Sequence, residues 1–246
     1  MRRMDRALVT GATSGIGAAT VRALRASRRD VLAIGRREER LAALAKETGA
    51  EVFVADVRDI TRISAGIEDF EPDILVNNAG VGHGITGIEG LDSEKVQEAF
   101  DINVTAPTQL IAAVLPRMRA QGRGHIVNIG SIAGLHTLVS AVYGGGKSAI
   151  HRISQNLRYE LSGSGIRVTE ICPGRVSSEF YSAAADEPGK LSALADLGIT
   201  ELAPADVASA ILYAIDTPPH VNVSLIELMP TEQSVGGVRA EPTIKR

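Results

Sequence analysis

The chain alternates, along nearly its whole length, between short apolar runs of strand length and longer amphipathic stretches of helix length. Strands that are apolar on both sides are typical of a parallel sheet that is covered on both faces. Right-handed crossovers through the intervening helices make such a sheet doubly wound. The sequence therefore predicts an α/β fold with a doubly wound parallel sheet of about seven strands and helices on both faces. The predicted strands are residues 6–10, 30–34, 51–55, 74–77, 125–129, 167–172 and 222–227, and the predicted helices are residues 16–26, 37–48, 60–70, 93–119, 142–162 and 205–215.

A length of 246 residues suits a single domain, residues 1–246, because such a chain can bury a sizeable core. Two prolines in the fourth predicted helix, Pro107 and Pro116, lead us to expect a bend or a break there. The segment 182–200 is rich in small and polar residues, which fits either a substrate lid or an ordinary surface insertion. Residues 231–246 form a predicted C-terminal tail that either reaches a neighbouring subunit or frays in solvent.

The composition argues against several classes of function. Hydrophobic residues make up 44% of the chain and charged residues 22%, which is typical of a globular protein. The net charge of −3 offers no electrostatic attraction to nucleic acid or to an anionic membrane. The single cysteine, Cys172, fits a reducing compartment, and no apolar run is long enough for a signal peptide or a bilayer span. We therefore expect a soluble, cytoplasmic protein, and we expect no metal because His83, His125 and His151 lack metal-ligand spacing.

A glycine-rich turn with the sequence TGATSGIG, residues 10–17, connects the first predicted strand to the first predicted helix. Glycines there let the backbone approach a pyrophosphate closely and let the helix pack tightly on the sheet. The helix N-terminus adds unpaired N–H groups and the positive end of its dipole. The flanking strand and helix favour a dinucleotide site over a merely tight turn. Its predicted binding residues are Gly11, Thr13, Ser14, Gly15, Ile16 and Gly17.

The end of the second strand predicts which dinucleotide is bound. Enzymes that use NAD usually carry Asp or Glu there, to hold the ribose 2′-hydroxyl. This chain has Arg36 and Arg37 instead, and no acid before Glu38. A guanidinium suits a 2′-phosphate, which a carboxylate would repel. We therefore predict NADP as the cofactor, the alternative being that the arginines merely begin a solvated helix face.

Tyr143 and Lys147 lie four residues apart in one predicted helix, and Ser131 follows the strand 125–129. A hydride that moves to or from a carbonyl carbon needs a matched proton at oxygen, but the ordinary tyrosine pKa of about 10 is too high near neutrality. A lysine on the same helix face stabilises the tyrosinate. Ser131 stands at the carboxyl edge of the sheet, where it can position a substrate oxygen. Together with the dinucleotide turn, these residues predict hydride transfer.

Three consecutive glycines, Gly144, Gly145 and Gly146, separate Tyr143 from Lys147. Each glycine inside a helix costs about 1 kcal/mol relative to Ala. We therefore expect another helix or the cofactor to approach this part of the chain closely.

Taken together, these residues resemble the short-chain dehydrogenase/reductase family, and the resemblance covers nearly the full chain. It implies a Rossmann-type fold. Its motifs appear in family order: the TGxxxGxG opening, Asp56-Val57, Asn77-Asn78-Ala79-Gly80, Asn103, Ser131, Tyr143-x-x-x-Lys147 and Pro173-Gly174.

The resemblance also implies a role for each of these residues. Tyr143 would be the acid/base, Lys147 would bind the nicotinamide ribose and lower the tyrosine pKa, and Ser131 would orient the substrate. Asn103 would hold a water in a proton relay to Lys147. The residues that would contact or support the cofactor are Asp56 and Val57 at the adenine, Asn78, Ala79 and Gly80 beside the central sheet, and Pro173, Gly174 and Val176 at the nicotinamide end.

Two features depart from the common family pattern and bear on the substrate. The spacing from Ser131 to Tyr143 is one residue shorter, so the loop 135–142 should reshape the pocket, and the triple glycine is smaller than usual. The carboxyl-terminal sequence resembles bacterial NADP-dependent 3-hydroxy acid dehydrogenases that act on serine or allo-threonine, and it is also comparable to an aldehyde reductase of clavulanate biosynthesis. For an acidic substrate, Arg175 could hold the carboxylate or could instead lie in solvent, whereas His136 is expected at the surface.

The sequence thus predicts an NADP-dependent oxidoreductase that interconverts a small hydroxy acid or secondary alcohol with its carbonyl. One alternative is an aldehyde or ketone reductase of secondary metabolism. An alternative of another class is a catalytically silent NADP-binding regulatory protein, against which the complete catalytic set argues. An epimerase or dehydratase fits poorly, because those relatives usually carry a longer substrate domain. The resemblance also implies a homodimer or homotetramer formed through the helices 93–119 and 142–162.

Overall fold

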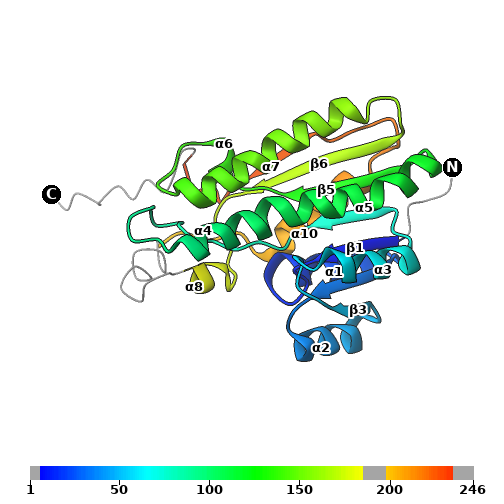
Figure 1. Cartoon of the computed structure of the whole chain (residues 1–246), viewed down its shortest axis with the longest axis horizontal. Coiled ribbons are helices and arrows are strands. Elements are labelled where there is room, and N and C mark those ends of the chain that lie inside the picture. Colours follow the sequence, from blue (N-terminus) through cyan, green and yellow to red (C-terminus); the bar gives the residue numbers. More distant parts are fainter. Residues whose placement is uncertain (1–5, 185–197, 235–246) are drawn as a thin grey trace.

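The computed structural model describes residues 6–184 and 198–234, and it is built around one parallel sheet (Figure 1). The strand order β3-β2-β1-β4-β5-β6-β7 reverses between β1 and β4, which confirms the predicted doubly wound fold. The strands are β1 (Arg6–Thr10), β2 (Asp30–Gly35), β3 (Glu51–Val54), β4 (Ile74–Asn77), β5 (Gly124–Ile129), β6 (Ile166–Pro173) and β7 (Leu225–Leu228). The helices are α1 (Gly15–Ala26), α2 (Glu38–Thr48), α3 (Ile60–Phe70), α4 (Ser93–Phe100), the π-helical turn η1 (Asp101–Thr105), α5 (Ala106–Gln121), α6 (Ile132–Leu135), α7 (Ala141–Glu160), α8 (Phe180–Ala184) and α10 (Pro204–Asp216).

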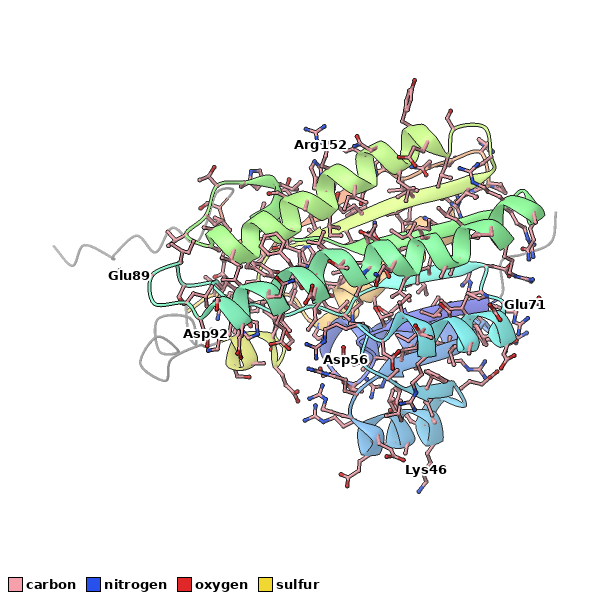
Figure 2. The ribbon with its side chains drawn as sticks, in the orientation of Figure 1. Lys46, Asp56, Glu71, Glu89, Asp92 and Arg152 are labelled. Carbon is pink, nitrogen blue, oxygen red and sulfur yellow. The ribbon has the colours of Figure 1, made fainter. Side chains whose placement is uncertain are left out.

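The side chains of the strands alternate between two apolar cores. In β1, Ala7 and Val9 pack in one core with α1, α2 and α10, whereas Leu8 packs in the other with α3, α5 and α7. Burying an aliphatic side chain of this size contributes about 1.5–3 kcal/mol. Charged side chains such as Lys46 on α2 and Arg152 on α7 point away from the sheet (Figure 2). This layering brings the carboxyl ends of all the strands to one edge.

The fourth predicted helix is interrupted, but not at a proline. It divides into α4, the π-helical turn η1 and α5, so the interruption falls at residues 101–105. Pro107 lies in the first turn of α5, where the missing N–H is not needed. Pro116 lies inside α5 without ending it. The predicted break within residues 93–119 is therefore present, but it falls in the π-helical turn and not at either proline.

The last strand begins later than the sequence indicates. Residues 222–227 were predicted, whereas β7 begins at Leu225. The Oδ1 atom of Asn222 accepts a hydrogen bond from the N–H of Val168 at 2.8 Å, and its Nδ2 atom donates to the Val168 carbonyl at 3.2 Å. A side chain thus takes the place of the backbone partner at this position.

Two predicted segments lie largely outside the described residues. Of the predicted lid, residues 185–197 lie outside them, and residues 182–184 belong to α8. Of the predicted tail, residues 235–246 lie outside them. None of the helices in the described ranges is long and apolar enough to cross a membrane.

Candidate active site

A cavity of about 1190 Å³ opens along the carboxyl edge of the sheet. It joins the turn after β1 to the loops that follow β2, β3, β4, β5 and β6. All the predicted site residues line it except Gly17 and Asn103, which lie behind its wall. Those that line it are Gly11, Thr13, Ser14, Gly15, Ile16, Arg36, Arg37, Asp56, Val57, Asn78, Ala79, Gly80, Ser131, Tyr143, Lys147, Pro173, Gly174 and Val176.

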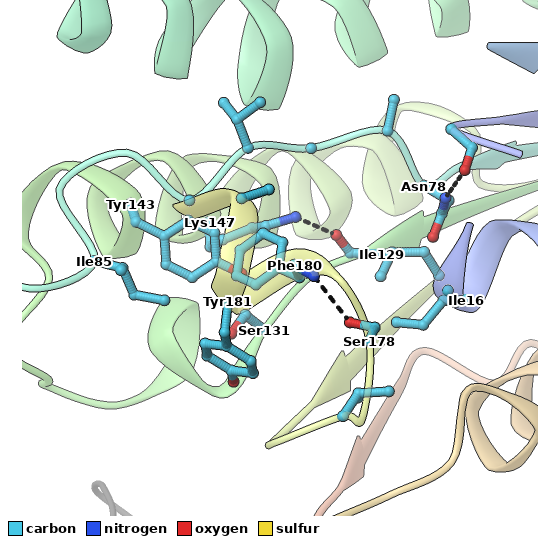
Figure 3. A pocket seen from close by; sticks show the side chains of 18 of the residues that line it. Ile16, Asn78, Ile85, Ile129, Ser131, Tyr143, Lys147, Ser178, Phe180 and Tyr181 are labelled. Atoms are coloured by element: carbon cyan, nitrogen blue, oxygen red, sulfur yellow. Dashed lines mark hydrogen bonds between the residues drawn. The ribbon is translucent and has the colours of Figure 1, made fainter. Parts of the chain in front are cut away.

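The glycines of the first turn are needed for backbone packing. Gly11 adopts a left-handed φ of 65°, and a Cβ there would lie 2.8 Å from the Cα of Ala79. A Cβ on Gly17 would lie 2.3 Å from the Gly11 carbonyl oxygen, so α1 can pack against this turn only without a side chain. Asn78 donates through Nδ2 to the carbonyls of Thr10 and Gly11 at 2.9 and 3.2 Å, and so fixes the turn to the end of β4 (Figure 3).

The amino end of α1 faces this cavity without a side-chain cap. Ser14 is its N-cap residue, but the Ser14 hydroxyl does not cap the helix. That hydroxyl instead accepts a hydrogen bond from Arg37 Nη2 at 2.7 Å, and Thr13 Oγ1 accepts from the same guanidinium at 2.9 and 3.0 Å. The turn therefore combines a helix N-terminus, two hydroxyls and a guanidinium, which are the groups that bind phosphate.

Arg36 and Asp56 lie on the neighbouring wall of the cavity. Arg36 is exposed, and its Nη1 atom lies 3.7 Å from Asp56 Oδ2. Asp56 also accepts two hydrogen bonds from the Arg58 guanidinium, at 2.7 and 3.0 Å. This pairing with Arg58, chiefly, lowers the pKa of the Asp56 carboxyl below its ordinary value. The aspartate is therefore held ionised and in a fixed position.

Ser131, Tyr143 and Lys147 come together at the inner part of the cavity (Figure 3). All three are at least 92% buried, and the side chain of Ser131 hydrogen-bonds that of Tyr143. The Lys147 ammonium donates to the Ile129 carbonyl at 2.7 Å and lies 5.9 Å from the centroid of the Tyr143 ring. The i, i+4 spacing on α7 thus places the lysine beside the tyrosine, as predicted from the sequence.

Burial shifts the pKa values of both groups. It lowers the pKa of Lys147 to about 8, because an ammonium loses hydration inside the protein. It raises the pKa of Tyr143 above its ordinary value, and the hydrogen bond from Ser131 counters this only in part. The sequence led us to expect that Lys147 lowers the tyrosine pKa, whereas in this structure burial of Tyr143 is the largest influence on that pKa and raises it.

Asn103 occupies the π-helical turn η1, behind the wall of the cavity. Its Oδ1 atom accepts from the Val81 N–H and its Nδ2 atom donates to the Val81 carbonyl, both at 2.9 Å. Gly80 lies between it and the lysine, since a Cβ on Gly80 would be 3.1 Å from Asn103 Oδ1 and 3.7 Å from Lys147 Nζ. The side-chain amide of Asn103 is therefore occupied by Val81, and its proposed relay to Lys147 stays a prediction.

The glycines between Tyr143 and Lys147 differ in what surrounds them. A Cβ on Gly144 would meet the Ala133 carbonyl of α6 and the Ser140 hydroxyl, both at 3.1 Å. The expected close approach of another helix is thus found at Gly144. A Cβ on Gly145 would meet no atom of the described residues within 4 Å. We find no packing reason for glycine at that position.

The short loop before α7 contributes directly to the cavity. Thr137, Leu138 and Ser140 line it together with Val139, which is 79% exposed. His136 does not line it; its Nε2 atom pairs with Glu227 Oε1 at 2.6 Å in a half-buried contact. The loop therefore shapes the mouth of the pocket, and the histidine connects it to β7.

Arg175 is buried, and a carboxylate compensates its charge. Its side chain is 4% exposed, its Nε atom donates to Glu201, and its guanidinium lies 4.2 Å from the centroid of the Tyr181 ring. The expected alternative of a solvated loop arginine is therefore wrong. Any carboxylate held by Arg175 would share it with Glu201.

Sequence reasoning missed several residues that line the cavity after β6 and β7. Phe180 lies 5.5 Å from Tyr143 between ring centroids, and Tyr181 stacks on Arg175. Gln233 is 9% exposed, and its Oε1 atom accepts from the Arg175 N–H at 2.8 Å. An adjacent pair of aromatic residues, in a chain with only four Phe and four Tyr, was the available signal.

Known proteins resemble this chain in sequence and in structure. The sequence profile of the short chain dehydrogenase family matches residues 5–188. An NADP-dependent 3-hydroxy acid dehydrogenase, YdfG, from Salmonella typhi is 37% identical over 94% of this chain and 97% of its own length. A sulfoacetaldehyde reductase from Chromohalobacter salexigens is 36% identical over 94% of this chain and 96% of its own length. The structure is similar to the closed form of serine dehydrogenase complexed with NADP+, with a TM-score of 0.87, 36% identity and coverage of 94% and 97% of the two chains. With its glycine-rich nucleotide turn at residues 10–17, its buried Ser131, Tyr143 and Lys147, and these matches, the chain belongs to the short-chain dehydrogenase/reductase family.

Proposed function

We propose that the protein is an NADP-dependent oxidoreductase that interconverts a small hydroxy acid with its carbonyl compound. The observation that carries this proposal is that one cavity is lined both by a phosphate-binding turn and by the buried residues Ser131, Tyr143 and Lys147. The names of the relatives, an NADP-dependent 3-hydroxy acid dehydrogenase and a serine dehydrogenase complexed with NADP+, support the same reaction class. They also argue against a catalytically silent regulatory protein.

The residues of the cavity fit NADP. Its volume of about 1190 Å³ exceeds that of most small-ligand sites, which is roughly 300–1,000 Å³, so it can hold a dinucleotide together with a substrate. The uncapped N-terminus of α1 suits the pyrophosphate, and Thr13, Ser14, Arg36 and Arg37 suit a 2′-phosphate. When bound, the cofactor supplies or accepts the hydride.

The protein's own residues supply the proton and the positioning. Tyr143 gives its hydroxyl proton to the substrate oxygen in reduction and takes it back in oxidation, which is typically worth about 10²–10⁴-fold in rate. Ser131 holds the same oxygen in place through its hydroxyl. Lys147, buried beside the ring, keeps a positive charge where tyrosinate forms and so offsets part of the desolvation cost. The ring of Phe180 packs near that of Tyr143, with 5.5 Å between the ring centroids.

The substrate class follows from the charge at the inner part of the cavity. Arg175 is the one arginine outside the predicted 2′-phosphate site among the described residues that line the cavity. It sits beside Tyr181 and shares its charge with Glu201, so it can attract an acid without binding it as tightly as an unshared guanidinium would. A reductase of small anionic aldehydes is the second candidate, because one relative is a sulfoacetaldehyde reductase. Both candidates place an acidic group near the reacting carbonyl.

The test is turnover of L-serine, L-allo-threonine and other 3-hydroxy acids with NADP+, with NAD+ in parallel, and of aldehydes with NADPH. Tyr143→Phe should keep NADPH affinity within about twofold and lower kcat by at least about 10²-fold. Tyr213→Phe makes the same chemical change on an exposed face of α10 and should match the wild type. Near-normal turnover of Tyr143→Phe would refute the acid/base role.

The proposal includes a cytoplasmic homo-oligomer formed through α4, α5 and α7. These helices carry the exposed apolar side chains of Phe100 and Tyr159, which are 38% and 87% exposed. Light scattering at micromolar concentration should give a dimer or a tetramer. A monomer would contradict this part of the proposal alone.

A further inference from the structure

The chain crosses the mouth of the cavity between β6 and α10 as a strap, residues 178–184, which includes α8. At one end, Ser178 packs on the nucleotide turn, since a Cβ on Gly15 would lie 3.2 Å from the Ser178 Cβ. Two residues further along the strap, the ring of Phe180 lies 5.5 Å from that of Tyr143 (Figure 3). The strap therefore touches both the cofactor end and the catalytic end of the cavity.

Glu179 fastens the strap to the far side of the nucleotide turn. Its Oε2 atom accepts from Arg37 Nη1 at 2.9 Å and from Arg40 Nη1 at 2.8 Å, and its Oε1 atom accepts from the same Arg40 nitrogen at 2.8 Å. These bonds, Arg40 first and Arg37 second, lower the pKa of the Glu179 carboxyl to about 2. The side chain is 52% exposed, so it can leave this position without breaking a core contact.

The same Arg37 guanidinium is the predicted partner of the cofactor 2′-phosphate. It also donates hydrogen bonds to the Thr13 and Ser14 hydroxyls of the turn. A carboxylate and a phosphate seek the same guanidinium donors, and two anions at one such site repel each other. We propose that Glu179 competes with the 2′-phosphate for Arg37 and Arg40, and thereby sets how strongly the enzyme prefers NADP to NAD. This inference rests on the proposed use of NADP.

The competition acts on one cofactor only. NAD has a hydroxyl in place of the 2′-phosphate, so Glu179 can keep both of its arginines while NAD is bound. NADP has to take Arg37 from Glu179, and this weakens NADP binding relative to a chain without the acid. Because Glu179 precedes Phe180, the same exchange alters how the strap is held against the catalytic end.

The test is isothermal titration of the wild type and of Glu179→Gln with NADP+ and NAD+, which needs no turnover. Because Glu179 is an exposed partner, its removal as a competitor should lower the Kd for NADP+ only modestly, by about three- to tenfold. The Kd for NAD+ should change by less than about twofold. Adenosine 2′,5′-bisphosphate and ADP, titrated in the same way, should reproduce this contrast without the nicotinamide end.

Glu39→Gln is the matched control, because it removes an exposed acid from the first turn of α2, beside the same arginines. Its Kd for NADP+ should stay close to that of the wild type. This control distinguishes the loss of the Glu179 contacts with Arg37 and Arg40 from the general effect of removing one negative charge. An unchanged or raised Kd for NADP+ in Glu179→Gln would overturn the competition while leaving NADP use intact. If neither the wild type nor Glu179→Gln binds NADP+ better than NAD+, the proposed cofactor is overturned, and the competition with it.

Discussion

Replacing Gly17 by Ala should loosen the nucleotide turn and destabilise the protein. Gly17 lies in the first turns of α1, where Ala would ordinarily be preferred by about 1 kcal/mol. The added Cβ, however, would lie 2.3 Å from the Gly11 carbonyl oxygen and 2.5 Å from Asn78 Nδ2. Neither the backbone oxygen nor the hydrogen-bonded amide can move without disturbing the end of β1 or β4. The helix itself must therefore shift away from the turn.

The expected magnitude follows from these two opposing effects. Overpacking a filled site usually costs about 1–3 kcal/mol, and contact with backbone places Gly17→Ala at the upper end. After the helix-propensity gain of about 1 kcal/mol, a net loss of about 2 kcal/mol remains. For a chain of this size such a loss lowers Tm by about 4–8 °C. Cofactor affinity should fall as well, because the N-terminus of α1 moves away from the pyrophosphate site.

Gly66→Ala is the matched control for this prediction. Gly66 lies in α3, and a Cβ there would meet Phe53 at 3.6 Å, an ordinary contact distance. This variant should gain up to about 1 kcal/mol and bind NADP+ normally. Urea unfolding and calorimetric titration of both variants measure the two effects. If Gly17→Ala is as stable as Gly66→Ala and binds NADP+ equally well, the packing argument is wrong.

Three further predictions concern buried groups. The pKa of Lys147 is about 8, below its unfolded value of about 10.5, so the native state gains stability as pH rises from 8 to 10.5. Across that range, the unfolding free energy of the cofactor-free wild type relative to Lys147→Met should rise by up to about 3 kcal/mol. A difference that stays constant with pH would contradict this prediction. Glu201→Gln leaves the Arg175 guanidinium buried without its carboxylate and should lower the free energy of unfolding in urea by roughly 2 kcal/mol. This is less than the roughly 3–5 kcal/mol expected for a fully buried pair, because Glu201 is 23% exposed. A decrease under about 0.5 kcal/mol would show that solvent replaces the pair. Cys172 is fully buried and burial raises its pKa, so a thiol reagent should label the chain only after unfolding, and rapid native labelling would show that this region opens.

The sequence was sufficient for the architecture and for most residues that line the candidate site, because these depend on local requirements. Strand periodicity and crossover handedness determine a doubly wound sheet whatever the details of packing. The left-handed φ of Gly11 and the i, i+4 spacing of Tyr143 and Lys147 are likewise properties of short segments. Residues that follow strands of one parallel sheet meet at its carboxyl edge, so Ser131 and the nucleotide turn converge in one cavity.

The tertiary structure decided what depends on partners distant in sequence. Arg37 meets Glu179 across 142 residues, and Arg175 meets Glu201 and Gln233 across 26 and 58. No local pattern indicates which acid neutralises which arginine. The direction of the Tyr143 pKa shift also came from burial by surrounding elements and not from its lysine neighbour. Sequence by itself determined the fold and the chemical groups, because these follow from short-range geometry, whereas charge pairing, burial and the position of the strap required the packed chain.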